Sequence, residues 1–264
     1  MAARIKVIVS GALGKMGVET AKAVQNDEEL ELAGLVDIRA KGEHEVEAGG
    51  QLALKVDNDL DRLIETARPD VMVDFTNPQA VYNNVKTALK HGISCVVGTT
   101  GLNEVELKQL EKLALDNAVG VAVIPNFAIG AVLMMKLAQE AARYFPDVEI
   151  IEMHHDQKID APSGTAIKTA EMITAQRVGH PARNSREYEK LAGARGGELN
   201  GIRIHSVRLP GFVAHQEVIF GGVGQSLRIR HDSFDRVGFM PGVVMTVKKM
   251  MGIKGLVYGL ENLL

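Results

Sequence analysis

The sequence predicts an α/β protein of two domains, in which a doubly wound parallel sheet is joined to an α+β domain with an open mixed or antiparallel sheet. Three observations lead to this prediction. A glycine-rich turn links a β-branched run to a helical segment near residue 11, strand-like and helical segments alternate as far as residue 124, and strands with period-two alternation follow residue 200. We expect the first domain to comprise residues 1–126 and 240–264, and the second to comprise residues 127–239.

The first half of the chain alternates between short apolar runs and helical segments. A strand, a glycine-rich turn, a helix and a second strand form one βαβ unit, over residues 5–10, 11–17, 15–24 and 30–36. The alternation continues with strands over residues 71–75, 93–97 and 119–124, and with helices over residues 78–91 and 103–117. These connections predict a parallel sheet with helices on both faces.

After Pro125 the pattern changes. A long helix, a strand, a second helix and three strands are predicted, over residues 130–144, 148–153, 166–178, 202–208, 214–220 and 226–231. Such an open sheet needs helices on one face, and its other face can pair with a copy of itself, which favours a homo-oligomer. The last stretch, residues 241–264, is predicted to be helical with a break at Gly252 and Gly255, and to pack on the first domain.

The composition excludes several classes of function. The chain has 264 residues, a formal net charge of −3 and no Trp, so it lacks the basic excess and the aromatic platforms of nucleic-acid-binding proteins. Charged or turn residues interrupt every apolar run before it reaches membrane-spanning length. The single cysteine, Cys95, lies in an apolar run, and we expect a buried, unreactive thiol rather than a nucleophile. Residues 1–6 show no signal-peptide pattern, which predicts a cytoplasmic protein.

The glycine-rich turn is the first candidate binding site. Its members are Gly11, Ala12, Leu13, Gly14, Lys15, Met16 and Gly17. In a turn between a strand and a helix, backbone amides can approach a pyrophosphate, and the positive end of the helix dipole favours the anion. An ordinary tight connection is the alternative, because the spacing GxxGxxG departs from the commoner GxGxxG.

Asp37, at the end of the second predicted strand, favours the binding interpretation. A carboxylate there can accept hydrogen bonds from the adenine ribose hydroxyls of NAD, although a solvated strand end is the alternative. Arg39 and Lys15 can neutralise the 2′-phosphate of NADP. We therefore predict a nicotinamide dinucleotide cofactor and the use of both NADH and NADPH.

Two further segments follow predicted strands at the place where α/β sheets bind ligands. Their residues are Gly98, Thr99 and Thr100 in one segment, and Ile124, Pro125, Asn126 and Phe127 in the other. The carboxyl ends of parallel strands share one edge of the sheet, so we expect these residues to surround the nicotinamide. Either segment can instead be a simple turn.

The segment after residue 152 concentrates groups that move protons. Adjacent side chains of a strand point to opposite faces, so His154 and His155 are expected to have different tasks, one in proton transfer and one in holding substrate. Lys158 can hold an anion or donate a proton, and a solvated surface lysine is the alternative. Adjacent histidines without a matching Cys or carboxylate set fit a metal site poorly, so we predict no metal.

A tight turn opens the helix that follows. Ser163, Gly164 and Thr165 stand at its start, where backbone amides and hydroxyls can bind a carboxylate. In the alternative interpretation, Ser163 or Thr165 only caps the helix.

Together these motifs resemble those of the 4-hydroxy-tetrahydrodipicolinate reductases, also called dihydrodipicolinate reductases. The resemblance spans nearly the whole chain and is most specific in the histidine segment; its motifs are His154-His155-x-x-Lys158-x-Asp160-Ala161-Pro162-Ser163-Gly164-Thr165-Ala166, Gly11-x-x-Gly14-x-Met16-Gly17, Gly98-Thr99-Thr100-Gly101 and Asn126-Phe127. It implies a reductase that transfers a nicotinamide hydride to a cyclic dicarboxylate, with loss of water, on the route to diaminopimelate and lysine. It also implies a homotetramer joined through the sheet of the second domain.

The resemblance implies a role for each site residue. His154 and Lys158 match the groups that handle the proton, His155 a substrate contact, and Gly164 with Thr165 the amides that bind a carboxylate. Which of His154 and Lys158 delivers the proton stays open. Two other functions compete with this prediction: a two-domain dehydrogenase of the homoserine or semialdehyde type, and a non-catalytic nucleotide-sensing protein.

Overall fold

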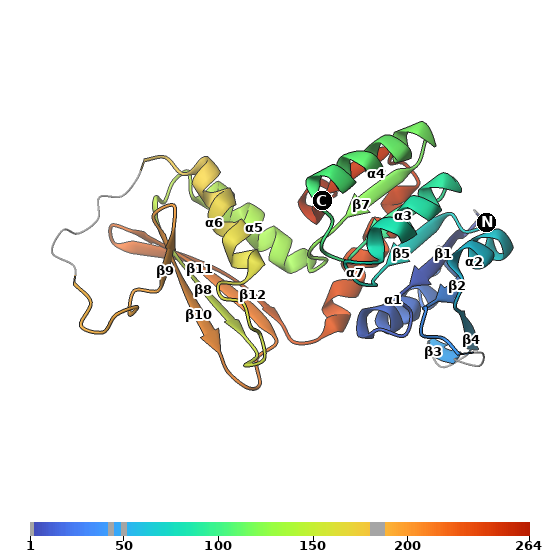
Figure 1. Cartoon of the computed structure of the whole chain (residues 1–264). Coiled ribbons are helices and arrows are strands. Elements are labelled where there is room, and N and C mark those ends of the chain that lie inside the picture. The colour runs from blue at the N-terminus through green and yellow to red at the C-terminus, as the bar shows by residue number, and fades with distance from the viewer. Residues whose placement is uncertain (1–2, 42–44, 49–51, 180–187) are drawn as a thin grey trace. The chain divides into compact units, whose positions relative to one another are not determined.

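The computed structural model describes residues 3–41, 45–48, 52–179 and 188–264 of the chain. They form two compact units, Met1–Phe127 with Phe239–Leu264, and Ala128–Gly238 (Figure 1). Each unit is built on its own sheet. The predicted class, a Rossmann-like doubly wound sheet with a second α+β unit, is confirmed.

The sheet of the first unit contains seven parallel strands and one antiparallel edge strand. In spatial order the strands are β13 (Gly255–Tyr258), β7 (Gly120–Val123), β6 (Ser94–Val97), β5 (Val71–Asp74), β1 (Ile5–Ser10), β2 (Leu30–Val36), β4 (Leu52–Asp57) and β3 (Glu45–Ala48). Only β3 pairs in the antiparallel direction, with β4. The central strands β1, β5, β6 and β7 are almost wholly buried, as expected for apolar strands covered on both faces.

Helices cover both faces of this sheet (Figure 1). One face packs against α2 (Leu60–Ala67), α3 (Val81–Lys90) and α4 (Glu104–Asp116), and the other against α1 (Lys15–Gln25) and α7 (Met240–Met250). The carboxyl ends of β1, β2, β5, β6 and β7 therefore meet at one edge, between the two helical layers. Cys95 lies in β6 and is fully buried, and burial raises the pKa of its thiol well above the usual value, so the prediction of an unreactive core thiol is confirmed.

Two parts of the first unit differ from the prediction. No element was predicted between residues 37 and 70, where the structure has β3, β4 and α2. The last stretch was predicted to be helical, but α7 ends at Met250 and is followed by the strand β13. The strand begins at Gly255 and is followed by Gly259, which have positive φ angles of 80° and 87°, and it forms because it pairs with β7. A strand of four residues that begins with a glycine carries no periodic signal of its own.

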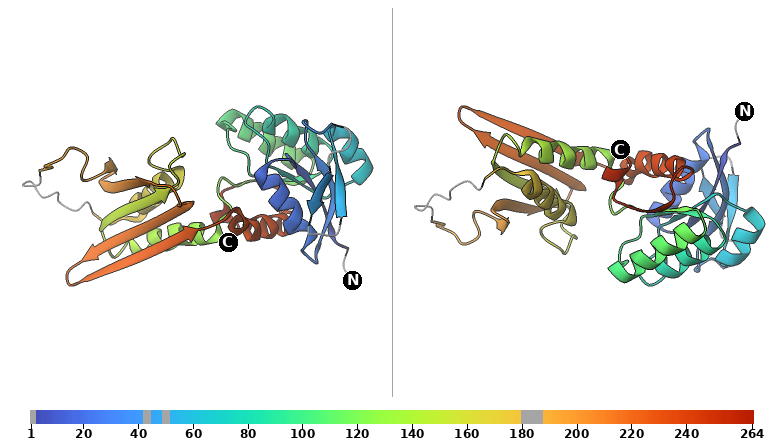
Figure 2. Two further views of the ribbon diagram at one scale, coloured as in Figure 1. Left: turned by 90° about the horizontal axis from the view of Figure 1, so that it is seen from below. Right: turned by 90° about the horizontal axis from the view of Figure 1, so that it is seen from above.

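The second unit has a five-stranded sheet with helices on one face (Figure 2). The spatial order is β12 (Gln225–Ser233), β11 (Ala214–Gly222), β8 (Asp147–His154), β10 (Ile202–Arg208) and β9 (Gly197–Leu199). Helices α5 (Ile129–Ala141) and α6 (Gly164–Gln176) pack on this sheet and on each other. Their apolar sides cover Ile150, Ile204 and Val218. Among the elements of this unit that the structure describes, none covers the opposite face of the sheet.

The sheet of the second unit is mixed. Strand β10 had the alternation of an antiparallel strand, yet it lies parallel to β8 and antiparallel only to β9. Helix α6 begins at Gly164, two residues before its predicted start, because Ser163 supplies the cap. No helix within the described ranges is both long and apolar enough to cross a membrane.

Candidate active site

The glycine-rich turn lies between β1 and α1 and is shaped by a close approach of the backbone. Gly11 has a φ angle of 82°, and a Cβ atom there would lie 2.3 Å from the carbonyl oxygen of Phe75. The N-cap residue of α1, Gly14, makes no side-chain cap, and the first turn of the helix holds no acidic side chain. The turn thus leaves room for an anion at the positive end of α1, which fits a pyrophosphate.

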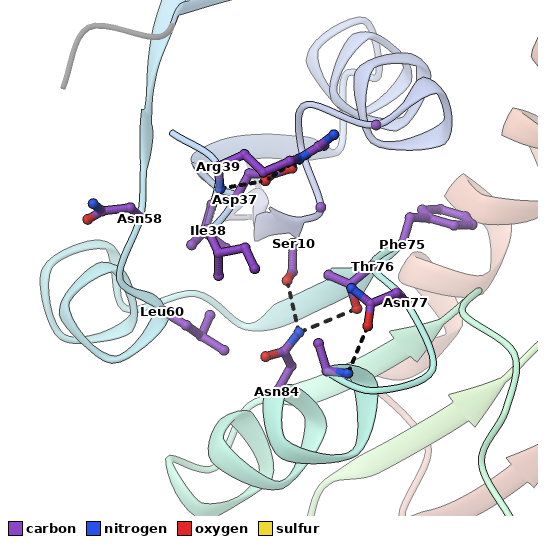
Figure 3. Close-up of a pocket in the computed structure, with 14 residues that line it drawn as sticks. Ser10, Asp37, Ile38, Arg39, Asn58, Leu60, Phe75, Thr76, Asn77 and Asn84 are labelled. Atoms are coloured by element: carbon purple, nitrogen blue, oxygen red, sulfur yellow. Dashed lines mark hydrogen bonds and ion pairs between the residues drawn. The ribbon is translucent and has the colours of Figure 1, made fainter. Parts of the chain in front are cut away.

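A pocket of about 380 Å³ opens beside this turn (Figure 3). Four of the predicted cofactor residues line it: Gly11, Gly14, Asp37 and Arg39. The prediction missed the other lining residues, which include Ser10, Asn58, Leu60, Thr76, Asn77 and Asn84. Ser10 and Thr76 stand at the ends of predicted strands and could have been found by that signal, whereas Asn58 and Leu60 belong to the region where no element was predicted.

Asp37 and Arg39 bind each other. Asp37 Oδ1 accepts hydrogen bonds from Arg39 N and Nε at 3.0 and 2.9 Å, and Oδ2 accepts from Leu13 N at 3.1 Å and Arg39 Nη2 at 2.8 Å. The Arg39 guanidinium lowers the pKa of Asp37, and the carboxylate in turn raises the pKa of Arg39. Four donors saturate a carboxylate, so a ribose hydroxyl reaches Asp37 only when Arg39 moves away. Because Arg39 is largely exposed to solvent, replacing its ion pair with Asp37 by a ribose hydroxyl costs little free energy.

Asp74 is a buried carboxylate that sequence reasoning did not single out. Its Oδ1 accepts hydrogen bonds from the hydroxyls of Thr76 and Thr99, both at 2.7 Å, and Oδ2 accepts from Asn84 Nδ2 at 2.9 Å. The Thr99 hydroxyl also accepts a hydrogen bond from Thr76 N at 2.8 Å. Thr99, which was predicted to lie near the nicotinamide, uses its hydroxyl within the protein, and Thr100, predicted with it, is exposed.

We expect Asp74→Ala to destabilise the first unit by about 1–3 kcal/mol, because the buried donor of Thr99 and the partly buried donors of Thr76 and Asn84 would lose their acceptor. Urea unfolding measures this loss. Asp70→Ala is the matched control, since Asp70 lies beside the opposite end of β5, is exposed and accepts one bond, from Lys6 N at 2.8 Å. Equal midpoints for the two variants would contradict the role given to Asp74.

The residues after β6 and β7 lie at the same edge of the sheet as the pocket. The ring of Phe75 packs beside Gly98, where a Cβ atom would lie 2.0 Å from its Cε1, and its centroid is 5.6 Å from that of Phe127. Ile124 and Phe127 are buried, whereas Pro125 is exposed. The contact of the half-buried Phe75 with the buried Phe127 fixes the two segments against each other at the strand ends.

In the second unit, β8 carries the histidine segment. His154 Nδ1 lies 2.5 Å from Glu152 Oε2, and the His154 side chain is only 15% exposed. His155 is exposed, so the adjacent histidines have different surroundings, as predicted. Lys158 is partly buried and donates from Nζ to Asp160 Oδ1 at 2.7 Å. The chain between residues 154 and 158 thus contains a partly buried imidazole, an imidazole exposed to solvent and an ammonium group.

Glu152 is the charged group that the sequence analysis did not identify. Burial raises the pKa of this fully buried side chain, but hydrogen bonds from His154, Arg208 and Ser206 outweigh that effect and lower the pKa to about 2. Arg208 donates to both of its oxygens, from Nη1 at 2.9 Å and from Nη2 at 2.8 Å. Glu152 is therefore ionised throughout the neutral range. Its signal in the sequence was its position two residues before His154 on one strand, which places both on the same face.

The start of α6 completes the second cluster. Ser163 is buried, and its hydroxyl accepts a hydrogen bond from Ala166 N at 3.2 Å, so the capping alternative is realised for this residue. Gly164 is exposed, and no atom outside its neighbours lies within 4 Å of the position of a Cβ. The first amides of α6 are therefore open to an anionic ligand at Gly164. Within the part of the chain that the structure describes, no three His, Cys, Asp or Glu side chains gather as they would around a metal.

The fold and these two clusters define a two-domain, nicotinamide-dependent oxidoreductase. A doubly wound domain presents a glycine turn and a strand-end acid, and a separate α+β domain carries the cluster of His154, His155 and Lys158. The model of the dihydrodipicolinate reductase N-terminus matches residues 5–127, and that of the C-terminus matches residues 130–264. The chain belongs to the dihydrodipicolinate reductase family.

Individual relatives agree with this assignment. The chain is 68% identical to a 4-hydroxy-tetrahydrodipicolinate reductase of Syntrophomonas wolfei over 266 residues, which cover all of both chains. It is 52% identical to the enzyme of that name from Desulfitobacterium hafniense, over 99% of each chain. A dipicolinate-bound dihydrodipicolinate reductase from Paenisporosarcina sp. TG-14 superposes with a TM-score of 0.90 and 50% identity, over 99% of this chain and 100% of the other.

Proposed function

We propose that this protein reduces 4-hydroxy-tetrahydrodipicolinate to tetrahydrodipicolinate in diaminopimelate and lysine biosynthesis. The overall change consumes one NAD(P)H and one proton, and releases NAD(P)⁺ and one water derived from the 4-hydroxyl group. The observation that carries the proposal is the joint presence, in a full-length member of this family, of the His154–Lys158 cluster and of a helix start open at Gly164. These are the groups that a proton-coupled reduction of a carboxylated ring requires.

The first unit would bind the cofactor. The turn from Gly11 to Met16 would hold the pyrophosphate, Asp37 or Arg39 the adenosine ribose, and the segments at Gly98–Thr100 and Ile124–Phe127 the nicotinamide end. When bound, the nicotinamide supplies the hydride. The mutual pairing of Asp37 and Arg39 supports the use of both cofactors, because Asp37 suits a ribose diol and a released Arg39 suits a 2′-phosphate.

The second unit would bind the substrate. A relative of this chain binds dipicolinate, a ring with two carboxylates. Here Gly164 and Thr165 offer helix amides for one carboxylate, while His155 and Lys158 offer side chains for the rest of the dianion. Ser163 would contribute by capping the helix start with its hydroxyl rather than by binding the carboxylate itself.

His154 and Lys158 would manage the proton that accompanies the hydride. Both lie close to the open helix start in sequence, and both are partly buried, so water competes weakly for their protons.

The uncovered face of the second sheet supports a homotetramer, and the absence of a membrane-spanning helix among the described residues is compatible with a cytoplasmic enzyme.

The test is a substrate screen. At 340 nm, oxidation of NADH and NADPH is followed with the condensation product of pyruvate and aspartate semialdehyde and, separately, with an aspartyl phosphate analogue, while reduction of NAD⁺ and NADP⁺ is followed with homoserine. Turnover with the first substrate only is expected. Turnover with homoserine or the aspartyl phosphate analogue would favour the rival dehydrogenases, and cofactor binding without any turnover would favour a sensor.

The Asp37–Arg39 pair gives a prediction on cofactor choice. Asp37→Ala should raise the KM for NADH about 10-fold, because the ribose diol loses its acceptor, and should lower the KM for NADPH, because Arg39 is released and a negative charge is gone. Arg39→Ala is the reciprocal variant and should raise only the KM for NADPH. Steady-state kinetics with both cofactors measures the four constants. Equal changes in KM for the two cofactors would show that neither side chain distinguishes a 2′-hydroxyl from a 2′-phosphate.

A methyl group at Gly164 gives a second prediction. Gly164→Ala should raise the KM for the substrate about 10-fold with kcat little changed, because the side chain would occupy the approach to the helix amides. The melting temperature should not fall, since a Cβ meets no atom there and Ala favours a helix. Gly252→Ala, at an uncrowded glycine of the first unit, is the control. An unchanged KM would remove the α6 start from the substrate site.

A further inference from the structure

The carboxylate of Glu152 is the one buried acidic group of the histidine segment that the proposed function does not use. It lies in the middle of the second sheet, between β10 and β11, where its neighbours across the strands are Ser206 and Gln216. Its side chain is fully buried, and four kinds of donor converge on it: an imidazole, a guanidinium, a hydroxyl and a backbone amide. A group so completely satisfied has one fixed orientation.

The contacts of Glu152 and Arg208 reach three points of the histidine segment. Glu152 Oε2 meets His154 Nδ1 at 2.5 Å, and Glu152 Oε1 accepts from Ser163 N at 3.3 Å. Arg208 Nη2, which also binds Glu152, donates to the carbonyl oxygen of Asp160 at 2.7 Å. Glu152 and Arg208 thus bind the proton-transfer histidine, the loop that carries Lys158 and the N-cap of α6. They hold these three parts in fixed positions relative to one another.

The hydrogen-bonding pattern decides where the proton of a neutral His154 resides. An ionised carboxylate can only accept, so Nδ1 must donate to Glu152 and carry the hydrogen. The other nitrogen, Nε2, is then left with a lone pair. A neutral ring in this tautomer takes up a proton and has none to give at Nε2, whereas the ammonium of Lys158 starts with one.

We propose that Glu152, held in place by its ion pair with Arg208, is a positioning residue with two roles. It fixes the tautomer of His154, and it anchors the start of α6, where the substrate carboxylate would bind. This inference rests on the proposed function, which makes His154 and Lys158 the proton-handling groups. It assigns proton delivery to Lys158, whose ammonium regains its proton from solvent after each turnover, and it leaves His154 with a basic Nε2 that has no proton to give. The low pKa of Glu152 supports the assignment, because the carboxylate stays ionised wherever the enzyme works.

The first measurement needs neither substrate nor a variant. The protein, with its histidines labelled with ¹⁵N, is studied by NMR as the pH is raised until the His154 ring is neutral, and the His154 signals are assigned by comparison with His154→Gln. In the neutral ring we expect the proton on Nδ1. A proton on Nε2 of the neutral ring would overturn the proposal whatever the enzyme's activity proves to be.

The second measurement is a double-mutant cycle. Glu152→Gln places an amide where the carboxylate was, and its NH₂ group can donate to Nδ1 and force the proton to Nε2. We expect kcat to fall about 10²-fold with a smaller change in KM, and the same substitution to have little further effect in a His154→Gln background. Equal factors in both backgrounds would mean that Glu152 does not act through His154.

The chain supplies a matched control for these variants. Glu149, also on β8, pairs with a histidine and an arginine, at 2.8 Å to His205 Nε2 and 2.5 Å to Arg195 Nη2, but on the opposite face of the strand. Glu149→Gln should leave kcat within about 2-fold and the His154 tautomer unchanged. A loss as large as that of Glu152→Gln would show a general weakening of the sheet and would contradict a specific positioning role.

Discussion

Replacing Lys158 by Met should lower kcat by about 10²-fold or more, because it removes the group that we propose delivers the proton. The substitution keeps most of the side-chain volume, and the ion pair it breaks involves the exposed Asp160, so the free energy of unfolding should change little. Pre-steady-state kinetics with substrate and NADH separates the chemical step from release of products.

The control for this variant is Lys112→Met. Lys112 on α4 pairs with Asp116 at 2.6 Å and resembles Lys158 in type and in partner, but it lies on an exposed helix of the first unit. Its loss should leave kcat and KM unchanged. An unchanged kcat with a raised KM for Lys158→Met would leave that residue only a binding role, and would return proton delivery to His154.

Replacing Gly11 by Ala should lower the stability of the first unit by about 3 kcal/mol and abolish tight cofactor binding. Two effects combine, since the φ angle of 82° is strained for a residue with a side chain, and the new Cβ would lie 2.3 Å from the backbone oxygen of Phe75. That oxygen belongs to the chain that follows β5, so the turn must move, and the amides that face the pyrophosphate move with it. Thermal unfolding and titration calorimetry with NADH measure the two losses.

Gly92→Ala separates strain from crowding. Gly92 also has a positive φ angle, 72°, but a Cβ there would meet no atom within 4 Å. Its replacement should cost about 1–2 kcal/mol and leave cofactor binding intact. If the two variants have the same melting temperature and the same affinity for NADH, the close approach to Phe75 does not shape the cofactor site.

Much of the first unit was predictable because its strands carry their own signal. Strands β1, β2, β5, β6 and β7 are short apolar runs bounded by turn residues, and helices α1, α3 and α4 have regular apolar spacing between them. The strand β13 was missed because its existence depends on pairing with β7. The direction of β10 was missed for the same reason, since alternation reports one buried face and not the direction of a neighbour.

The site was predictable as a set of residue types and not as a set of contacts. Glycines, a strand-end acid and the His154–Lys158 segment have recognisable spacing in the chain. The hydrogen bond from Thr99 to Asp74 could not be predicted, because the direction of a side chain at a strand end is set by its buried neighbours. Glu152 and Arg208 stand 56 residues apart, and no local pattern connects them.

The sequence alone determined the two-domain class, the family and the chemistry available at each motif, because these follow from local periodicity and from short ordered motifs. Only the tertiary structure decided that Arg39 fills the hydrogen-bonding sites of Asp37, that Ser163 caps α6, and that a buried Glu152 accepts a hydrogen bond from His154. The physical reason is that a polar side chain must satisfy its hydrogen bonds when it is buried, and its partners are brought to it by the sheet rather than by neighbours in the chain.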